Sequence, residues 1–223
     1  MPARFVYWMN VSADLRIERD PQEQGGGDWM RITESLHREF NARAARLTMG
    51  VEGRVIYETM ESFWPEARHD QSQPDFLREY GEIWTTMPKV LVSRTRTSAD
   101  HNTRIIGAND DAVEQLARIR AESSGDIGVG GATIATMLLR AHLLDELVLY
   151  IHPVILGRGR PLFDEPIEPV DLDLLEVQTY EQGVVLHRYG IRASSTSTDG
   201  PAPAVPVRGV GVVHQGAPVA DGE

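Results

Sequence analysis

Residues 128–134 read Gly128-Val129-Gly130-Gly131-Ala132-Thr133-Ile134. Asp126-Ile127 before them can enter the turn as a short strand, and the apolar residues that follow recur at helical spacing (Ile134, Met137, Leu138 and Ala141). The segment therefore predicts a strand, a glycine turn and the start of a helix. Glycines let a backbone approach a ligand closely, and the first free N–H groups of a helix attract anions. The turn is a candidate phosphate site, although such turns also join strands to helices where nothing binds.

Strand-like and helix-like patterns alternate along the rest of the chain. Strands are expected at residues 4–11, 47–51, 88–93, 103–106 and 146–151. Helices are expected at residues 34–46, 53–63, 75–84 and 110–122, the last with Asp110 as its N-cap. Two runs near the end, residues 174–179 and 183–189, are expected to pair as an antiparallel hairpin. This alternation predicts an α/β protein whose sheet is covered on both faces.

The composition excludes several classes of protein. The 223 residues are 41% hydrophobic and 25% charged, which is typical of a soluble protein with one good core. The formal net charge of −11 argues against a nucleic-acid binder, which needs a basic face. No window is apolar enough to span a bilayer, so no membrane association is expected. The first apolar run, residues 5–9, is too short for a secretion signal, and a cytoplasmic protein is expected.

Two further features limit the chemistry and the domain boundaries. The chain has no cysteine, which excludes disulfides, thiolate catalysis and cysteine-ligated metals. The histidines show no metal-ligand spacing, so no metal site is expected. From residue 193 the chain is rich in Ser, Thr, Pro, Gly and Ala. We therefore expect a domain over residues 1–192 and a tail over residues 193–223.

Three regions carry a family resemblance through their order and spacing. They are residues 53–58 (GRVIYE), residues 88–95 (PKVLVSRT) and residues 128–163, which hold the glycine turn, LLDE at 143–146 and PVILGRGRPLF at 153–163. The prolines that bracket this last motif indicate a hairpin turn. Over residues 4–190 the chain resembles the dihydrofolate reductase-like superfamily, and more closely its riboflavin-biosynthesis reductase branch (the RibD C-terminal domain). The resemblance implies a three-layer α/β/α fold, with a mostly parallel central sheet and a C-terminal antiparallel hairpin, and a reductase that uses NADPH.

The resemblance also assigns the cofactor site to residues that follow strands. These are Gly53, Arg54, Ser93, Arg94, Gly128, Gly130, Gly131, Ala132 and Thr133. In a parallel sheet such positions converge on one crevice. Two guanidinium groups and a hydroxyl suit a ribose 2′-phosphate, because arginine makes forked, charge-assisted hydrogen bonds. The glycine turn and the Thr133 hydroxyl would then hold the pyrophosphate. Without the family frame, both arginines are better explained as ordinary solvated side chains.

The substrate side offers one candidate catalytic residue, Asp14. The family's first strand ends in Ser-Leu-Asp-Gly, and here the run is Ser12-Ala13-Asp14-Leu15. Asp14 could accept a hydrogen bond from a ring N–H of the substrate or take part in a proton relay. The alternative is an aspartate that only bonds the backbone of its turn. Three aromatic residues, Trp29, Tyr57 and Trp64, are candidate walls of the substrate pocket.

Three departures from the family pattern bear on activity. Leu15 replaces a glycine, Ile56 stands where threonine is frequent, and Glu52 places a carboxylate beside the expected phosphate site. The expected function is a NADPH-dependent reductase that transfers a hydride to a small heterocycle, pteridine-like or aminopyrimidine-like, as in dihydrofolate or phosphoribosylaminouracil reduction. The alternative is a non-catalytic nucleotide-binding or interaction module on the same fold. The family commonly pairs subunits, and the apolar runs 147–151 and 184–186 support an expected homodimer.

Overall fold

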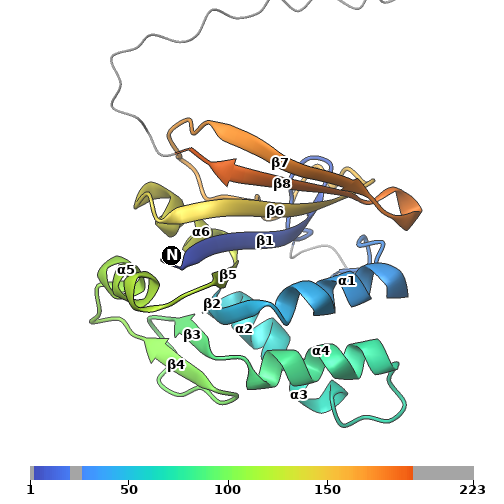
Figure 1. The fold of residues 1–223 in the computed structure, drawn as a ribbon, viewed down its shortest axis with the longest axis horizontal. Helices are drawn as coiled ribbons and strands as arrows, with labels where there is room; N and C mark the ends of the chain where they lie inside the picture. The colour runs from blue at the N-terminus through green and yellow to red at the C-terminus, as the bar shows by residue number, and fades with distance from the viewer. Residues whose placement is uncertain (1–2, 21–26, 193–223) are drawn as a thin grey trace, which may run out of the picture. The chain divides into compact units, whose positions relative to one another are not determined.

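A computed structural model describes residues 3–20 and 27–192 (Figure 1). The described strands form one eight-stranded sheet in the order β4-β3-β2-β5-β1-β6-β8-β7. They are β1 (Arg4–Ser12), β2 (Leu47–Gly53), β3 (Lys89–Val92), β4 (Thr103–Ile106), β5 (Asp126–Gly130), β6 (Leu144–His152), β7 (Leu172–Thr179) and β8 (Val185–Ile191). The helices are α1 (Glu34–Ala44), α2 (Arg54–Glu61), α3 (Trp64–Ala67), α4 (Asp75–Thr86), α5 (Ala112–Glu122) and α6 (Ala132–Arg140), with a 3₁₀ turn η1 (Glu181–Gly183).

The sheet is mostly parallel, which confirms the fold class predicted from the sequence. All pairings among strands β1 to β6 are parallel. Strand β8 pairs antiparallel with both β6 and β7, so the C-terminal hairpin lies at one end of the sheet. The expected tail over residues 193–223 lies outside the described residues.

Helices cover both faces of the sheet because side chains alternate along its strands. On β1, Phe5 packs in a buried cluster that includes Leu116 of α5 and Leu138 of α6. The next residue, Val6, points to the opposite face and packs in a second cluster with Leu36 of α1. A third cluster joins Tyr57, Trp84 and Leu91 beneath α2 and α4. No helix in the described part of the chain has the length and apolar character that a membrane span requires.

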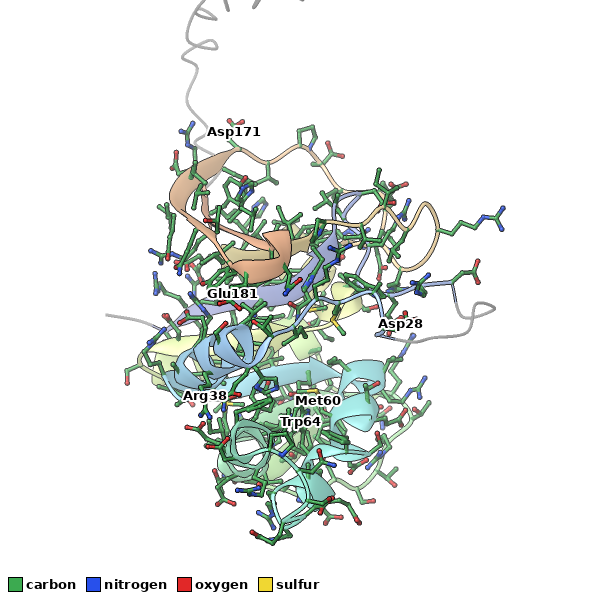
Figure 2. All side chains as sticks on the ribbon, turned by 90° about the vertical axis from the view of Figure 1, so that its right-hand side faces the viewer. Asp28, Arg38, Met60, Trp64, Asp171 and Glu181 are labelled. Atoms are coloured by element: carbon green, nitrogen blue, oxygen red, sulfur yellow. The ribbon has the colours of Figure 1, made fainter. Side chains whose placement is uncertain are left out.

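The central strands β5 and β1 separate at their carboxyl ends. We call this side of the sheet, where the parallel strands end, the open edge. The ladder between them ends at Tyr7 and Val129, whereas the ladder between β1 and β6 continues to Ser12 and His152. The chain leaves β1 for α1 on one face and leaves β5 for α6 on the other. Such a point, where crossovers depart to opposite faces, is where open α/β sheets bind ligands. Figure 1 shows β1 and β6 running toward this edge, and Figure 2 looks onto it.

Two local expectations from the sequence are wrong. The N-cap of α5 is Asp111, whose carboxylate accepts a hydrogen bond from the Glu114 N–H, while Asp110 accepts one from the Gly107 N–H in the preceding turn. Adjacent aspartates are equally good caps, and the fold selects the second.

The PVILGRGRPLF motif does not form a hairpin of its own. Residues 153–163 make a loop that bonds instead to the segment after β1: the Ala13 N–H donates to the Val154 carbonyl, and the Ile17 N–H to the Arg160 carbonyl. A single bridge joins Arg16 to Pro161. Gly159 is needed for that approach, since a Cβ there would lie 1.9 Å from the Glu18 carbonyl oxygen.

Candidate functional site

Two helices begin side by side at the open edge of the sheet. Gly53 is the N-cap of α2 and Gly131 the N-cap of α6, and neither helix start receives a side-chain cap. The two starts adjoin because Glu52 of β2 pairs with Gly130 of β5. A Cβ on Gly53 would lie 3.3 Å from Ile134 Cγ1. Two sets of uncapped N–H groups therefore meet at the carboxyl ends of the central strands, an arrangement that attracts an anion. We call this place, where the fold rule for open α/β sheets expects a ligand, the crevice.

The glycines at this edge serve different purposes. Gly131 has a φ of +94°, so the turn into α6 needs a residue without a side chain. A Cβ on Gly130 would lie 3.3 Å from Ile56 Cγ2, so that glycine lets the two helix starts approach. Gly128 lies inside β5 rather than in the turn, and a Cβ there would lie 2.7 Å from Leu47 Cδ1. Its role is to make room for packing within the sheet, away from the expected phosphate.

The two arginines expected to bind a phosphate both lie at this edge. Arg54 opens α2, and its Nη1 lies 2.7 Å from a carboxylate oxygen of Glu58 one helical turn later. Arg94 follows β3, is exposed and makes no ion pair within the described residues. Ser93 is buried, and its hydroxyl oxygen accepts hydrogen bonds from the N–H groups of Thr95 and Arg96. The structure brings the three residues together, with Arg94 free to reach a ligand.

A further arginine, Arg160, lies at the glycine turn, and no local pattern in the sequence predicts it there. The Thr133 hydroxyl donates to Asp164 at 3.0 Å and accepts from Arg160 Nη2 at 2.9 Å. Arg160 also pairs with Asp164 at 2.6 Å. The guanidinium thus lies beside the first turn of α6, where the Asp164 carboxylate balances its charge and the pair engages the Thr133 hydroxyl. The nearest sequence signal for this contact is the pair of glycines in residues 157–160, which is typical of a loop that packs closely against another segment.

A cavity of about 410 Å³ adjoins this turn between α5 and α6. Its lining is largely apolar, with Val113, Met137 and Ala141 beside Thr133 and Arg140. Cavities of this size accommodate small ligands. A second cavity, of about 450 Å³, opens on the α1 face of the sheet, away from the helix starts, and is lined by residues such as Trp8, Arg43 and Arg188.

Asp14 is committed to the backbone of a neighbouring loop. Its carboxylate accepts hydrogen bonds from the N–H groups of Leu156 at 3.0 Å and Gly157 at 2.8 Å, and from the Ser12 hydroxyl at 2.7 Å. Partial burial alone would raise the pKa of Asp14, but these hydrogen bonds outweigh it and lower the pKa to about 2. A group that stays ionised at neutral pH is a poor proton donor. The geometry thus favours the second interpretation of Asp14, in which it braces a turn.

Two of the three expected wall residues, Tyr57 and Trp64, belong to one buried cluster, and Trp29 lies apart from it. Trp29 packs edge-on against His152 at the end of β6. Tyr57 is fully buried, and its hydroxyl donates to the Asp100 carbonyl. Trp64 packs on Tyr80, and its indole N–H points at the sulfur of Met60, which Figure 2 shows beside it. Trp29 contacts the end of β6, whereas Tyr57 packs into the interior against Leu91 of β3. The sequence does not reveal which side of an element an aromatic ring occupies.

Glu52 points away from the crevice and into the protein. One of its oxygens accepts a hydrogen bond from the Trp84 indole at 3.0 Å, and the other has no partner. Burial raises the pKa of Glu52 to about 7, although Trp84 and the nearby Lys89 oppose the shift. Lys89 donates to the carbonyls of Trp84 and Met87, and burial lowers its pKa to about 8. The carboxylate therefore does not stand between the crevice and an incoming phosphate.

The described residues contain no group of three or more His, Asp or Glu side chains arranged to hold a metal ion. The candidate site consists of main-chain N–H groups, arginines and one apolar cavity. This set can bind an elongated anion with an apolar end.

Known proteins resemble this chain in sequence and in fold. Residues 6–186 match the model of the RibD C-terminal domain family. Two curated proteins of Bacillus subtilis strain 168, both named as uncharacterized, are similar in sequence. YyaP is 31% identical over 134 residues, which cover 60% of this chain and 68% of YyaP. YwjB is 32% identical over 80 residues, which cover 35% of this chain and 46% of YwjB.

Solved structures share the fold at low sequence identity. A proposed riboflavin biosynthesis protein from Shewanella sp. PV-4 aligns with a TM-score of 0.66 and 19% identity, over 86% of this chain and 100% of that chain. A pyrimidine reductase-like protein from Corynebacterium diphtheriae aligns at 0.58 and 12%, over 86% and 92%. The deaminase/5-amino-6-(5-phosphoribosylamino)uracil reductase of Thermotoga maritima aligns at 0.58 and 13%, and this chain covers 57% of it. At these identities the likeness shows the fold.

Proposed function

The chain belongs to the RibD C-terminal domain family, a family of reductase-like domains, and from this premise we propose that it is a NADPH-dependent reductase of a small heterocycle. The substrate class would be a pteridine or an aminopyrimidine, as in the reduction of dihydrofolate or of phosphoribosylaminouracils. The observation that carries the proposal is the meeting of two uncapped helix starts, at Gly53 and Gly131, on the edge where β5 and β1 separate.

The residues of this edge fit a dinucleotide phosphate. The N–H groups that follow Gly131, those of Ala132 and Thr133, would bind the pyrophosphate, since no side chain occupies them. Arg54 and Arg94 would bind the ribose 2′-phosphate in forked hydrogen bonds. To do so Arg54 must release Glu58 and bind the ligand instead. The Arg54–Glu58 ion pair lies on the surface, so breaking it costs little free energy.

The chemistry divides between cofactor and protein. NADPH supplies the hydride when it is bound, and the protein supplies orientation, the exclusion of water and the phosphate contacts. Arg160, bonded to Thr133 and paired with Asp164, would hold the loop of residues 153–163 against the first turn of α6. The loop of residues 153–163, held by Asp14, would fix the edge of the crevice next to β1.

A nucleotide titration tests the cofactor assignment. The purified full-length chain is titrated with NADPH and, separately, with NADH, and tryptophan fluorescence is followed. We expect NADPH to bind more tightly, because each charge-assisted contact to the 2′-phosphate contributes about 1.5–3 kcal/mol. In the double variant Arg54→Ala/Arg94→Ala the preference over NADH should fall by at least about tenfold.

The matched control for this titration is Arg118→Ala. Arg118 pairs with Glu114 one helical turn away, as Arg54 does with Glu58, but it lies on exposed α5. Its replacement should leave both affinities unchanged. If the preference for NADPH survives the double change at Arg54 and Arg94, the assigned 2′-phosphate site is wrong.

The contacts of Asp14 support a second candidate function, in which the protein binds a nucleotide but catalyses no reaction. The Asp14 carboxylate is occupied by main-chain N–H groups, and these hydrogen bonds lower its pKa to about 2, which favours the ionised form near neutral pH over a proton donor. NADPH oxidation in the presence of pteridines and aminopyrimidines separates the two functions. Binding without oxidation of NADPH by any of these compounds would favour the second function.

A further inference from the structure

Asn10 lies where β1 runs past the end of its pairing with β5. The β1–β5 ladder stops at Tyr7, so the last residues of β1 border the crevice on that side. Side chains alternate along the strand, which places Asn10 on the same face as Val6 and Trp8, toward α1. The side chain is half-buried. Nothing in the cofactor assignment uses it.

The hydrogen bonds around His152 fix the orientation of the Asn10 amide. The main-chain N–H of Arg31 lies 2.9 Å from His152 Nδ1 and can only donate, so Nδ1 is an acceptor. A neutral imidazole has one acceptor nitrogen and one N–H, so Nε2 carries the proton. Nε2 lies 3.0 Å from Asn10 Oδ1, which must therefore accept. The amide cannot turn over without placing two N–H groups against each other.

His152 is held in this form by its surroundings. The ring is completely buried, and Trp29 packs edge-on against it with 5.5 Å between ring centroids. Burial lowers the pKa of His152 to about 4, and the nearby charge of Arg31 acts in the same direction. The imidazole is thus neutral throughout the physiological range, and Asn10 is held in one orientation.

The consequence concerns the other half of the amide. Its NH₂ group has no hydrogen-bond acceptor among the described residues and is not enclosed by them. Two N–H donors, fixed in direction by a buried ring, are therefore available at the border of the crevice. Such preorganised donors suit an acceptor atom on a ligand, because no ordering cost remains for them.

We propose that Asn10 is a specificity-determining residue that donates its amide N–H to a carbonyl oxygen or unprotonated ring nitrogen of the heterocyclic substrate. His152 acts as a positioning residue that fixes the direction of that donor. The inference rests on the proposed reductase function for the identity of the site, and it narrows the substrate to heterocycles that present an acceptor at this point. A heterocycle with an amino group there would place donor against donor.

Two pairs of ligands test this preference directly. The first is pterin and its diaminopteridine analogue, in which an amino group replaces the ring carbonyl. The second is diaminouracil and the aminopyrimidine in which an amino group replaces one ring carbonyl of diaminouracil. Binding is measured by calorimetry on the full chain, with and without NADPH. We expect the carbonyl compound of at least one pair to bind more tightly, by about tenfold or more, since an unpaired buried donor is costly.

The variant Asn10→Asp keeps the size of the side chain and replaces its NH₂ donor with an oxygen acceptor. An aspartate still accepts the proton of His152 Nε2, but it offers the ligand an acceptor in place of the N–H groups. The preference within the pair should reverse, so that the amino compound binds more tightly. A residue that merely supports the fold would weaken both ligands alike. Nitrogen NMR of the His152 ring should show the Nε2–H form in the wild type and a raised pKa of His152 in the variant.

Asn102→Asp is the matched control. Asn102 directly precedes β4, at the amino end of the strands and away from the crevice, and its amide donates to the Thr86 carbonyl. Its exchange should therefore leave the ligand preference as it was. An unchanged preference in Asn10→Asp, or no binding of either pair to the wild type, would overturn the inference. If the preference reverses while NADPH fails to bind, the inference holds and the proposed reductase function does not.

Discussion

Glu52 buries its carboxyl group one residue before the helix start at Gly53, next to Lys89 and Trp84. Because burial raises its pKa to about 7, the folded protein holds this proton more tightly than the unfolded chain, where the usual value is 4.5. Stability linked to this group is complete below about pH 4.5 and is lost as the pH rises toward 7. Burial lowers the pKa of Lys89 from 10.5 to about 8, so stability linked to Lys89 changes only between about pH 8 and 10.5. The pH range linked to Glu52 therefore does not overlap the range linked to Lys89.

We predict that Glu52→Gln flattens the pH dependence of unfolding between about pH 5 and 7. The glutamine oxygen can still accept from the Trp84 indole, and the variant carries no charge to desolvate. Relative to the wild type, its stability should rise by about 2 kcal/mol from the acid to the neutral end of the window. Urea unfolding at several pH values measures this. The exposed Glu114, changed to glutamine, is the control, and equal slopes for Glu52→Gln and wild type would contradict a raised pKa.

Asp14 supports a second prediction at this scale. If its carboxylate braces the loop through the N–H groups of Leu156 and Gly157, Asp14→Asn should lower the free energy of unfolding by about 1–2 kcal/mol. Since the pKa is depressed to about 2, this stability is present above about pH 4 and lost as the pH falls through 2. Thermal melts at about pH 7 and pH 3 check the sign. A proton-donor role would instead appear as an ionisation near neutral pH in the rate profile, absent in Asp14→Asn.

At the scale of elements, the turn between β5 and α6 depends on a backbone that only glycine adopts easily. Gly131 has a φ of +94°, and an alanine there would cost about 1–3 kcal/mol. We predict that Gly131→Ala lowers stability by this amount and weakens NADPH binding more than tenfold, because the first N–H groups of α6 move. Denaturant unfolding and nucleotide titration measure the two effects.

Gly107→Ala is the control for that change. A Cβ there would meet only Asp110 Oδ2, at 3.5 Å, which is ordinary contact. Both stability and binding should stay close to wild type. Unimpaired NADPH binding by a folded Gly131→Ala protein would remove the glycine turn from the cofactor site.

The elements also show what a sequence can predict. Strand and helix positions follow from local periodicity, so β1, α2 and α6 lie where the pattern placed them. Contacts between distant segments do not follow. The loop of residues 153–163 pairs with residues 13–18, and its bonds to Ile17 and Asp14 have no local signal. For the same reason the sequence missed Arg160 at the glycine turn and the inward direction of Glu52.

At the scale of the whole molecule, the surface that could join two copies differs from the one expected. The apolar runs 147–151 and 184–186 lie mainly inside the sheet, because β6 is paired on both sides and Leu186 is fully buried. Exposed apolar side chains gather instead on the edge strand β7, where Leu174 is 58% and Val177 is 53% exposed. An unprotected apolar edge strand is a site of association between chains.

We therefore predict a homodimer that forms through β7. Two copies related by a twofold axis would bury Leu174 and Val177 of each chain and extend the sheet or cover its end. Light scattering at micromolar concentration should give twice the chain mass for the wild type, and a monomer for Leu174→Lys/Val177→Lys. Ile155→Lys is the control, since Ile155 is still more exposed, at 77%, but lies on the loop beside Asp14. A monomeric wild type would refute the dimer, and a dimeric double variant would move the interface away from β7.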